Sequence, residues 1–106
     1  MPKYLFQVNY VGEGVKGLLK EGGTKRRAAA EQAAKSVGAT MESFYYAFGD
    51  TDAYVIGDFP DNASAAALAL TVSASGAATV KTTVLMNCEE LDAAVKKSLV
   101  YRAPGQ

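Results

Sequence analysis

The sequence lacks histidine and tryptophan altogether and contains one cysteine, Cys88. Without histidine there can be no Ser-His-Asp triad or Cys-His pair, and no zinc or non-haem iron site that uses imidazole ligands. No side chain then has an ordinary pKa near neutrality, so acid-base chemistry would require a strongly shifted Asp, Glu, Lys, Tyr or Cys. A lone cysteine also excludes an intrachain disulfide, which is typical of proteins in a reducing compartment.

Neither sign of charge is in excess, because 11 Lys and Arg residues balance 11 Asp and Glu residues. Nucleic-acid-binding proteins usually carry a basic surplus, so we expect no nucleic-acid partner. The longest apolar run, residues 65–70, is far too short to span a bilayer, and residues 1–10 alternate polar and apolar side chains instead of forming a signal peptide. We therefore expect a cytoplasmic protein with no membrane contact, no bound metal and no cofactor.

The length of 106 residues and the hydrophobic fraction of 49% are typical of one globular domain. We predict a single domain over residues 1–100 and a short tail over residues 101–106. So small a domain has a poor surface-to-volume ratio, and zero net charge gives two copies little reason to repel each other. Self-association is therefore favoured.

Alternating apolar and polar residues predict four strands, and helical periodicity with caps and glycine stops predicts the helices between them. The expected strands cover residues 3–10, 40–48, 53–59 and 78–86. A short helix or a turn is expected over residues 12–20. Helices are expected over residues 24–37 with Thr24 as the cap, 63–75 with Asp61 or Asn62 as the cap, and 89–99 with Lys96 and Lys97 in the last turn. This β-α-β-β-α-β order predicts an α+β domain with the ferredoxin-like fold. Right-handed crossovers give a four-stranded antiparallel sheet in the spatial order 4-1-3-2, with both crossover helices on one face.

Large side chains occupy both faces of the two strands within residues 43–59. The alternation places the even-numbered residues of 4–10 in the first strand toward the helices. On the second strand it places Phe44 and Tyr46 on one face, and Met41 and Tyr45 on the other. One layer of helices covers only one face, and the many alanines of the helix at 63–75 should let it approach that face closely. The other face is mixed in polarity, which favours a sheet-to-sheet homodimer or a higher homo-oligomer that encloses some polar groups.

Residues 48–61, FGDTDAYVIGDFPD, resemble the GYD domain family, which is named for a Gly-x-Tyr-Asp turn between the second and third strands. Gly49 and Asp52 match the glycine and the aspartate of that turn, whereas Thr51 stands in place of the tyrosine. The resemblance covers about residues 3–98 and implies a ferredoxin-like fold of the dimeric α/β barrel type. It implies no established activity, because the family is largely uncharacterised.

Four residues are candidate ligand-binding groups. Tyr46 and Tyr54 offer ring faces and hydroxyls, Asp52 offers a carboxylate, and Lys81 offers a cation in the middle of the last strand. Each residue also has a structural interpretation. Turn formation accounts for Asp50 and Asp52, core or interface packing accounts for the tyrosines, and a solvated position at the rim accounts for the lysine.

The run Lys25, Arg26 and Arg27 falls in the first turn of an expected helix, where each exposed cation opposes the helix dipole at about 0.3–1 kcal/mol. A bound anion at this helix N-terminus would offset that cost, which makes the three residues candidate anion-binding groups. Two other interpretations remain open. One is a solvated face that tolerates the cost. The other is ion pairing with nearby acids, namely Asp50, Asp52 or Asp58.

These features predict a small-molecule-binding or interaction module, whether or not it is an enzyme. One alternative is a cofactor-independent enzyme of the dimeric α/β barrel type, similar to a monooxygenase or an isomerase, which rests on fold analogy with related barrels. A further alternative is a structural subunit of a ring assembly. In that case the alanine-rich helix at 63–75 and the tail at 101–106 would supply the extra contacts.

Overall fold

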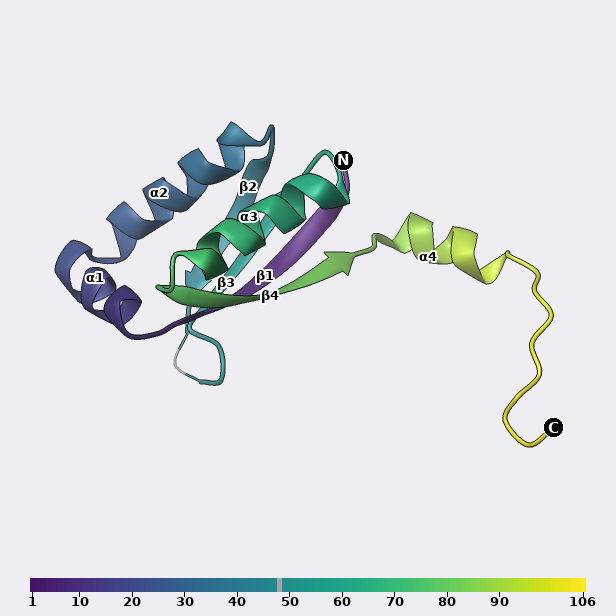
Figure 1. The fold of residues 1–106 in the computed structure, drawn as a ribbon. Coiled ribbons are helices and arrows are strands. Elements are labelled where there is room, and N and C mark those ends of the chain that lie inside the picture. Colours follow the sequence, from purple (N-terminus) through teal and green to yellow (C-terminus); the bar gives the residue numbers. More distant parts are fainter. Residues whose placement is uncertain (48) are drawn as a thin grey trace.

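The computed structural model describes residues 1–47 and 49–106 and has the α+β architecture that the sequence predicts (Figure 1). In chain order the elements are β1 (Lys3–Tyr10), α1 (Glu13–Glu21), α2 (Gly23–Ser36), β2 (Thr40–Tyr46), β3 (Ala53–Asp58), α3 (Asn62–Ala74), β4 (Ala78–Leu85) and α4 (Cys88–Val95). The strands form one antiparallel sheet in the order β2-β3-β1-β4, which is the predicted ferredoxin-like order. The predicted second strand ran to Phe48, which lies outside the described residues.

The core lies between the sheet and helices α2 and α3, which cover the same face (Figure 1). Tyr4 and Phe6 of β1 point toward the helices and pack against Phe59, whose ring centroid lies 5.7 Å from that of Tyr4. The buried hydroxyl of Tyr4 donates to the side-chain oxygen of Asn62, so it is not left without a partner. The predicted inward face of β1 is confirmed.

Local capping explains where α3 begins and corrects the start of α2. Of the two predicted caps of α3, the structure has Asp61, whose carboxylate accepts a hydrogen bond from the backbone N–H of Ser64 at 2.8 Å. That bond lowers the pKa of Asp61. Thr24 was expected to cap α2, and this expectation is wrong. Gly22, with a φ of 83°, allows the chain to turn directly from α1 into α2, so the helix begins before the threonine.

An irregularity in β2 corrects the predicted side of Met41. Met41 pairs with Gly57 and Ser43 pairs with Ile56, so Glu42 is an extra residue in the strand. A bulge of this kind shifts the alternation by one residue, and Met41 therefore shares the helix-covered face with Phe44, not the opposite face with Tyr45.

The last helix is shorter than predicted and stands away from the sheet. It starts with a capping box between Asn87 and Glu90 but ends at Val95, so the two lysines expected in its last turn lie beyond it. Every residue of α4 is exposed, and an isolated helix shorter than about 12 residues is only marginally stable without tertiary packing. We call residues 87–103 the C-terminal arm (Figure 1).

The arm makes the molecule elongated. Its apolar side chains include Leu99, which is 77% exposed, and Tyr101, which is 73% exposed. The radius of gyration is 16.9 Å, whereas a compact chain of this length has about 13 Å. Among the described residues, no helix combines the length and the apolar character needed to cross a membrane.

Candidate functional site

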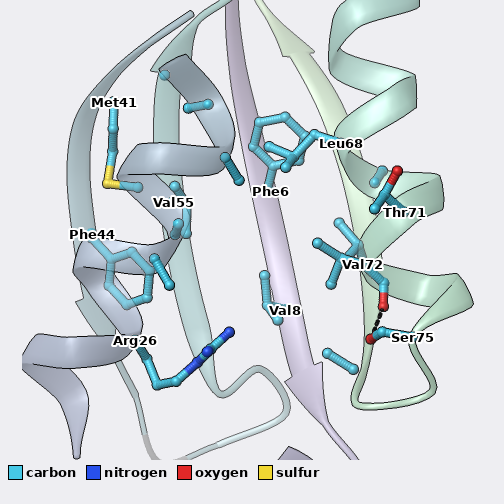
Figure 2. A pocket seen from close by; sticks show the side chains of 18 of the residues that line it. Phe6, Val8, Arg26, Met41, Phe44, Val55, Leu68, Thr71, Val72 and Ser75 are labelled. Atoms are coloured by element: carbon cyan, nitrogen blue, oxygen red, sulfur yellow. Dashed lines mark hydrogen bonds between the residues drawn. The ribbon is translucent and has the colours of Figure 1, made fainter. Parts of the chain in front are cut away.

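An apolar pocket of about 300 Å³ lies between the sheet and the two helices that cover it, and we call it the helix-face pocket (Figure 2). Its floor comes from Val8 of β1, Val55 of β3 and Val80 of β4. Small side chains form much of the wall on the α2 side, namely Ala29, Ala30, Ala33 and Ala34. Because alanines are too short to reach across the gap between α2 and α3, the space above the floor is not filled.

The two ends of the helix-face pocket differ in chemistry. One end is lined by Phe6 and Phe59, whose ring centroids lie 5.2 Å apart. The other end is lined by Tyr10, Arg26 and Ser75. The hydroxyl of Ser75 donates to the carbonyl oxygen of Val72 at 2.6 Å, so it is already used within its helix. The pocket is therefore a mostly apolar cleft with one polar end.

Arg26 and Tyr46 define the electrostatics of that polar end. Figure 2 shows the Arg26 side chain reaching from α2 across the pocket toward Val8. Its Nη1 atom lies 3.7 Å from the Oε1 atom of Glu21. The hydroxyl of Tyr46 donates to the carbonyl oxygen of Gly23 at 3.0 Å, and burial raises the pKa of Tyr46 to about 12. The nearby Tyr10 hydroxyl raises this pKa further, whereas the Arg26 charge lowers it.

A second pocket, of about 520 Å³, lies on the helix-free face of the sheet, and we call it the sheet-face pocket. Unlike the first pocket, it is mostly polar. Its lining includes Gln7, Asn9, Asp50, Thr51, Tyr54, Thr79 and Lys81. The strand register explains the arrangement, because Tyr45, Tyr54, Gln7 and Lys81 form one cross-strand row over β2, β3, β1 and β4.

The four predicted ligand-binding residues do not share one pocket within the described part of the chain. Tyr54 and Lys81 both line the sheet-face pocket, whereas Tyr46 lies on the opposite face. Asp52 fastens the turn to β1, since its carboxylate accepts a hydrogen bond from the backbone N–H of Tyr10 at 2.9 Å. The backbone N–H of Asp52 also donates to the side-chain oxygen of Asn9 at 3.0 Å.

The three cations of the basic run, Lys25, Arg26 and Arg27, also differ in their surroundings. Arg27 pairs with Glu31 one turn along α2 at 3.3 Å, and Arg26 pairs with Glu21. One of the open interpretations was ion pairing with aspartates of the β2–β3 region, but the partners among the described residues are glutamates of α1 and α2. Of the three cations, Arg26 alone lines the helix-face pocket. Anion binding by the run as a whole stays a prediction.

The helix-face pocket was missed by the sequence analysis. Alanines at 63–75 were interpreted as permitting close approach of a helix to the sheet. One feature of the sequence does point to the pocket. Alanines on α2 and small residues on α3 face the sheet, and such short side chains leave space above it. Interpreting this feature requires the distance between the two helices, which the sequence does not contain.

The family model described as GYD domain matches residues 4–95. No curated protein and no solved structure matches the chain. The matched range includes helices α1 to α4 and all of the sheet except Lys3, so both pockets lie within it.

Proposed function

The chain belongs to the GYD domain family, and on this premise we propose that it is a small-molecule-binding module whose ligand site is the helix-face pocket. The observation that carries the proposal is an apolar cleft of about 300 Å³ with a few polar groups at one end. Ligand pockets in proteins commonly have this composition, and their volumes begin at about 300 Å³.

Energetics support a bound ligand. Protein interiors hold few voids larger than a water molecule. The helix-face pocket is not enclosed, and it leaves an apolar wall uncovered by other side chains. An apolar ligand that covers the wall would therefore bind favourably.

A neutral apolar dye tests this proposal. We expect 1-aminonaphthalene, a neutral dye of about the size that a pocket of about 300 Å³ can hold, to bind with increased fluorescence. Ala33→Leu, which narrows the helix-face pocket, should weaken binding severalfold. Ala28→Leu makes the same change at an exposed position of α2 that does not line the pocket, and it should bind the dye like the unchanged protein. Equal binding by both variants would place the dye elsewhere, for example on the C-terminal arm, and would contradict the proposal.

Self-association is part of the same proposal. The helix-free face presents Tyr45, which is 71% exposed, next to Tyr54, which is 38% exposed. Leu5 and Ile56 lie half-buried on the same face, and the C-terminal arm adds further exposed apolar side chains. A second copy of the chain would cover these surfaces and enclose the sheet-face pocket. The same exposed surfaces also support the alternative of a structural subunit in a larger assembly.

The cofactor-independent enzyme is the alternative that the sheet-face pocket favours. Tyr54, Lys81 and Asp50 converge on that pocket, and together they supply a hydroxyl, an ammonium group and a carboxylate. Chemistry there would need a second copy to exclude water. Under this alternative, Lys81→Met would abolish turnover of a substrate and leave dye binding in the helix-face pocket unchanged.

A further inference from the structure

We infer, resting on the proposed binding function, that the ligand of the helix-face pocket is an amphipathic organic acid whose apolar body lies between α2 and α3 and whose carboxylate meets Arg26. The proposal combines three properties of the pocket: its charge, the availability of its cation and its size.

Charge is distributed unevenly over the pocket. Among the described lining residues, Arg26 is the one with a charged side chain, and most of the others are apolar. A cationic headgroup would be repelled there. An anionic headgroup would gain a charge-assisted hydrogen bond, which is about twice as strong as a neutral one. The pocket therefore distinguishes ligands by the sign of the headgroup.

Arg26 retains the donors that a carboxylate needs. A guanidinium group has five N–H donors in a planar fork that matches the two oxygens of a carboxylate. The distance of 3.7 Å between its Nη1 atom and Glu21 is longer than the 2.7–2.9 Å of a charge-assisted hydrogen bond. This weak pair orients the side chain but leaves guanidinium N–H donors available for a ligand. Figure 2 shows the side chain directed over the pocket.

The place of Arg26 in α2 also favours an anion. The first turn of α2 contains no acidic residue, and its N-cap, Gly22, provides no side-chain acceptor. Lys25 and Arg26 therefore oppose the helix dipole without local compensation from a cap. A ligand carboxylate beside Arg26 would reduce that unfavourable field. The same acid would gain little at Lys25 or Arg27, since neither lines the pocket.

Size limits the apolar body. A water molecule occupies about 30 Å³ of liquid volume, so a pocket of about 300 Å³ holds roughly ten non-hydrogen atoms of similar volume. Octanoate has about that number. Its methyl end would face the aromatic end at Phe6 and Phe59, and its carboxylate would face Arg26 and Tyr10 at the other end.

Three ligands with the same chain test the inference: octanoate, 1-octanol and octylammonium. Each is titrated into ¹⁵N-labelled protein at physiological ionic strength, and the shifts of backbone amides that line the pocket give the Kd. We expect octanoate to bind about tenfold more tightly than 1-octanol. Octylammonium should bind more weakly than both. Arg26→Met should abolish the preference for octanoate and retain binding of 1-octanol.

Lys35→Met is the matched control, because it removes one positive charge from the exposed last turn of α2, away from the pocket. It should retain the tenfold preference. A second readout uses octanoate labelled with ¹³C at the carboxyl carbon. Its pKa should be lower when bound to the unchanged protein than when bound to Arg26→Met.

The outcomes distinguish the inference of an acid ligand from the proposed binding function on which it rests. If 1-octanol binds as tightly as octanoate, or if the preference for octanoate survives Arg26→Met, the acid inference is overturned while the pocket's binding function stands. If neither octanoate nor 1-octanol perturbs the pocket amides, both are overturned. Preserved amide dispersion in Arg26→Met shows that a loss of preference is not a loss of fold.

Discussion

Gly14 of α1 lies against the backbone of Ala77, at the turn that leads into β4. A Cβ atom added to Gly14 would lie 1.8 Å from the carbonyl oxygen of Ala77. The same oxygen accepts a hydrogen bond from the backbone N–H of Val11 at 2.9 Å. The start of α1 is therefore fastened to the edge of the sheet by a contact that leaves no room for a side chain.

Gly14→Ala should destabilise the protein by about 1–3 kcal/mol, because the backbone of one of the two segments must move to admit the methyl group. Gly17→Ala is the control within the same helix. Nothing lies within 4 Å of a Cβ atom at Gly17, so the helix propensity of alanine should stabilise this variant by about 0.5–1 kcal/mol. Urea unfolding measures both. Equal stability of Gly14→Ala and the unchanged protein would mean that this contact is not close in solution.

Asp52 offers a test between a structural role and a ligand-binding role. Its carboxylate accepts the N–H of Tyr10, and Asp52→Ala would leave that half-buried N–H without this acceptor. We expect a loss of about 1–3 kcal/mol in the free energy of unfolding. Asp50→Ala, at an exposed position of the same turn, should change stability by less than about 0.5 kcal/mol. If Asp52 serves a ligand alone, both variants would unfold at the same urea concentration as the unchanged protein.

Local sequence patterns predicted most of the fold. The features that they missed depend on contacts with other helices and strands. The alternation in β1 and the cap of α3 depend on a few neighbouring residues, so the inward face of β1 and a cap at Asp61 or Asn62 were predicted correctly. The side of Met41 was not, because a bulge depends on pairing with β3. The end of α4 was missed for a related reason, since no neighbouring element supports a longer helix.

The candidate site was likewise predicted only in part, because some of its features depend on how the strands and helices pair. Tyr54 and Lys81 were both proposed as ligand-binding residues, and the register places them on one cross-strand row. Tyr46 was grouped with them, yet it faces the helices, because Tyr45 and not Tyr46 pairs with Tyr54. Only the register decides which of two adjacent tyrosines joins a given row. The helix-face pocket depends on the spacing of α2 and α3, which no local pattern encodes.

Stability should fall at high pH because of Tyr46. A tyrosine in the unfolded chain loses its proton near pH 10, whereas Tyr46 in the folded protein has a pKa of about 12. Between these values the folded state binds more protons, so the free energy of unfolding decreases as pH rises from 10 to 12 and is unaffected below that window. Tyr46 is partly exposed, so solvent screening makes this decrease smaller than the full pKa difference implies.

Ultraviolet titration of the phenolate groups checks this assignment. Tyr46→Phe should remove the component that titrates near pH 12 and should reduce the loss of stability between pH 10 and 12. Tyr45→Phe changes an exposed neighbour and should preserve both. A late component that persists in Tyr46→Phe would assign the raised pKa to a different residue.

Self-association should depend on the C-terminal arm. Leu91 and Val95 lie four residues apart on one face of α4, and both are exposed. We expect the unchanged protein to be at least a dimer at micromolar concentration, as measured by size-exclusion chromatography with light scattering. The double variant Leu91→Gln, Val95→Gln should shift it toward the monomer, because two apolar side chains then no longer bury against the second copy.

The fold itself should be unaffected by these two changes, since α4 stands away from the sheet that organises the core (Figure 1). The circular dichroism spectrum and the dispersion of the amide chemical shifts in residues 3–85 should be retained. Ala93→Gln is the matched control, because residue 93 lies on the opposite side of α4 from Leu91 and Val95. It should leave the mass of the assembly unchanged. An unchanged protein that is monomeric throughout the micromolar range would refute both the role of the arm and the proposed self-association. A dimer that tolerates the double variant would instead assign the interface to the helix-free face, where Tyr45 and Tyr54 lie.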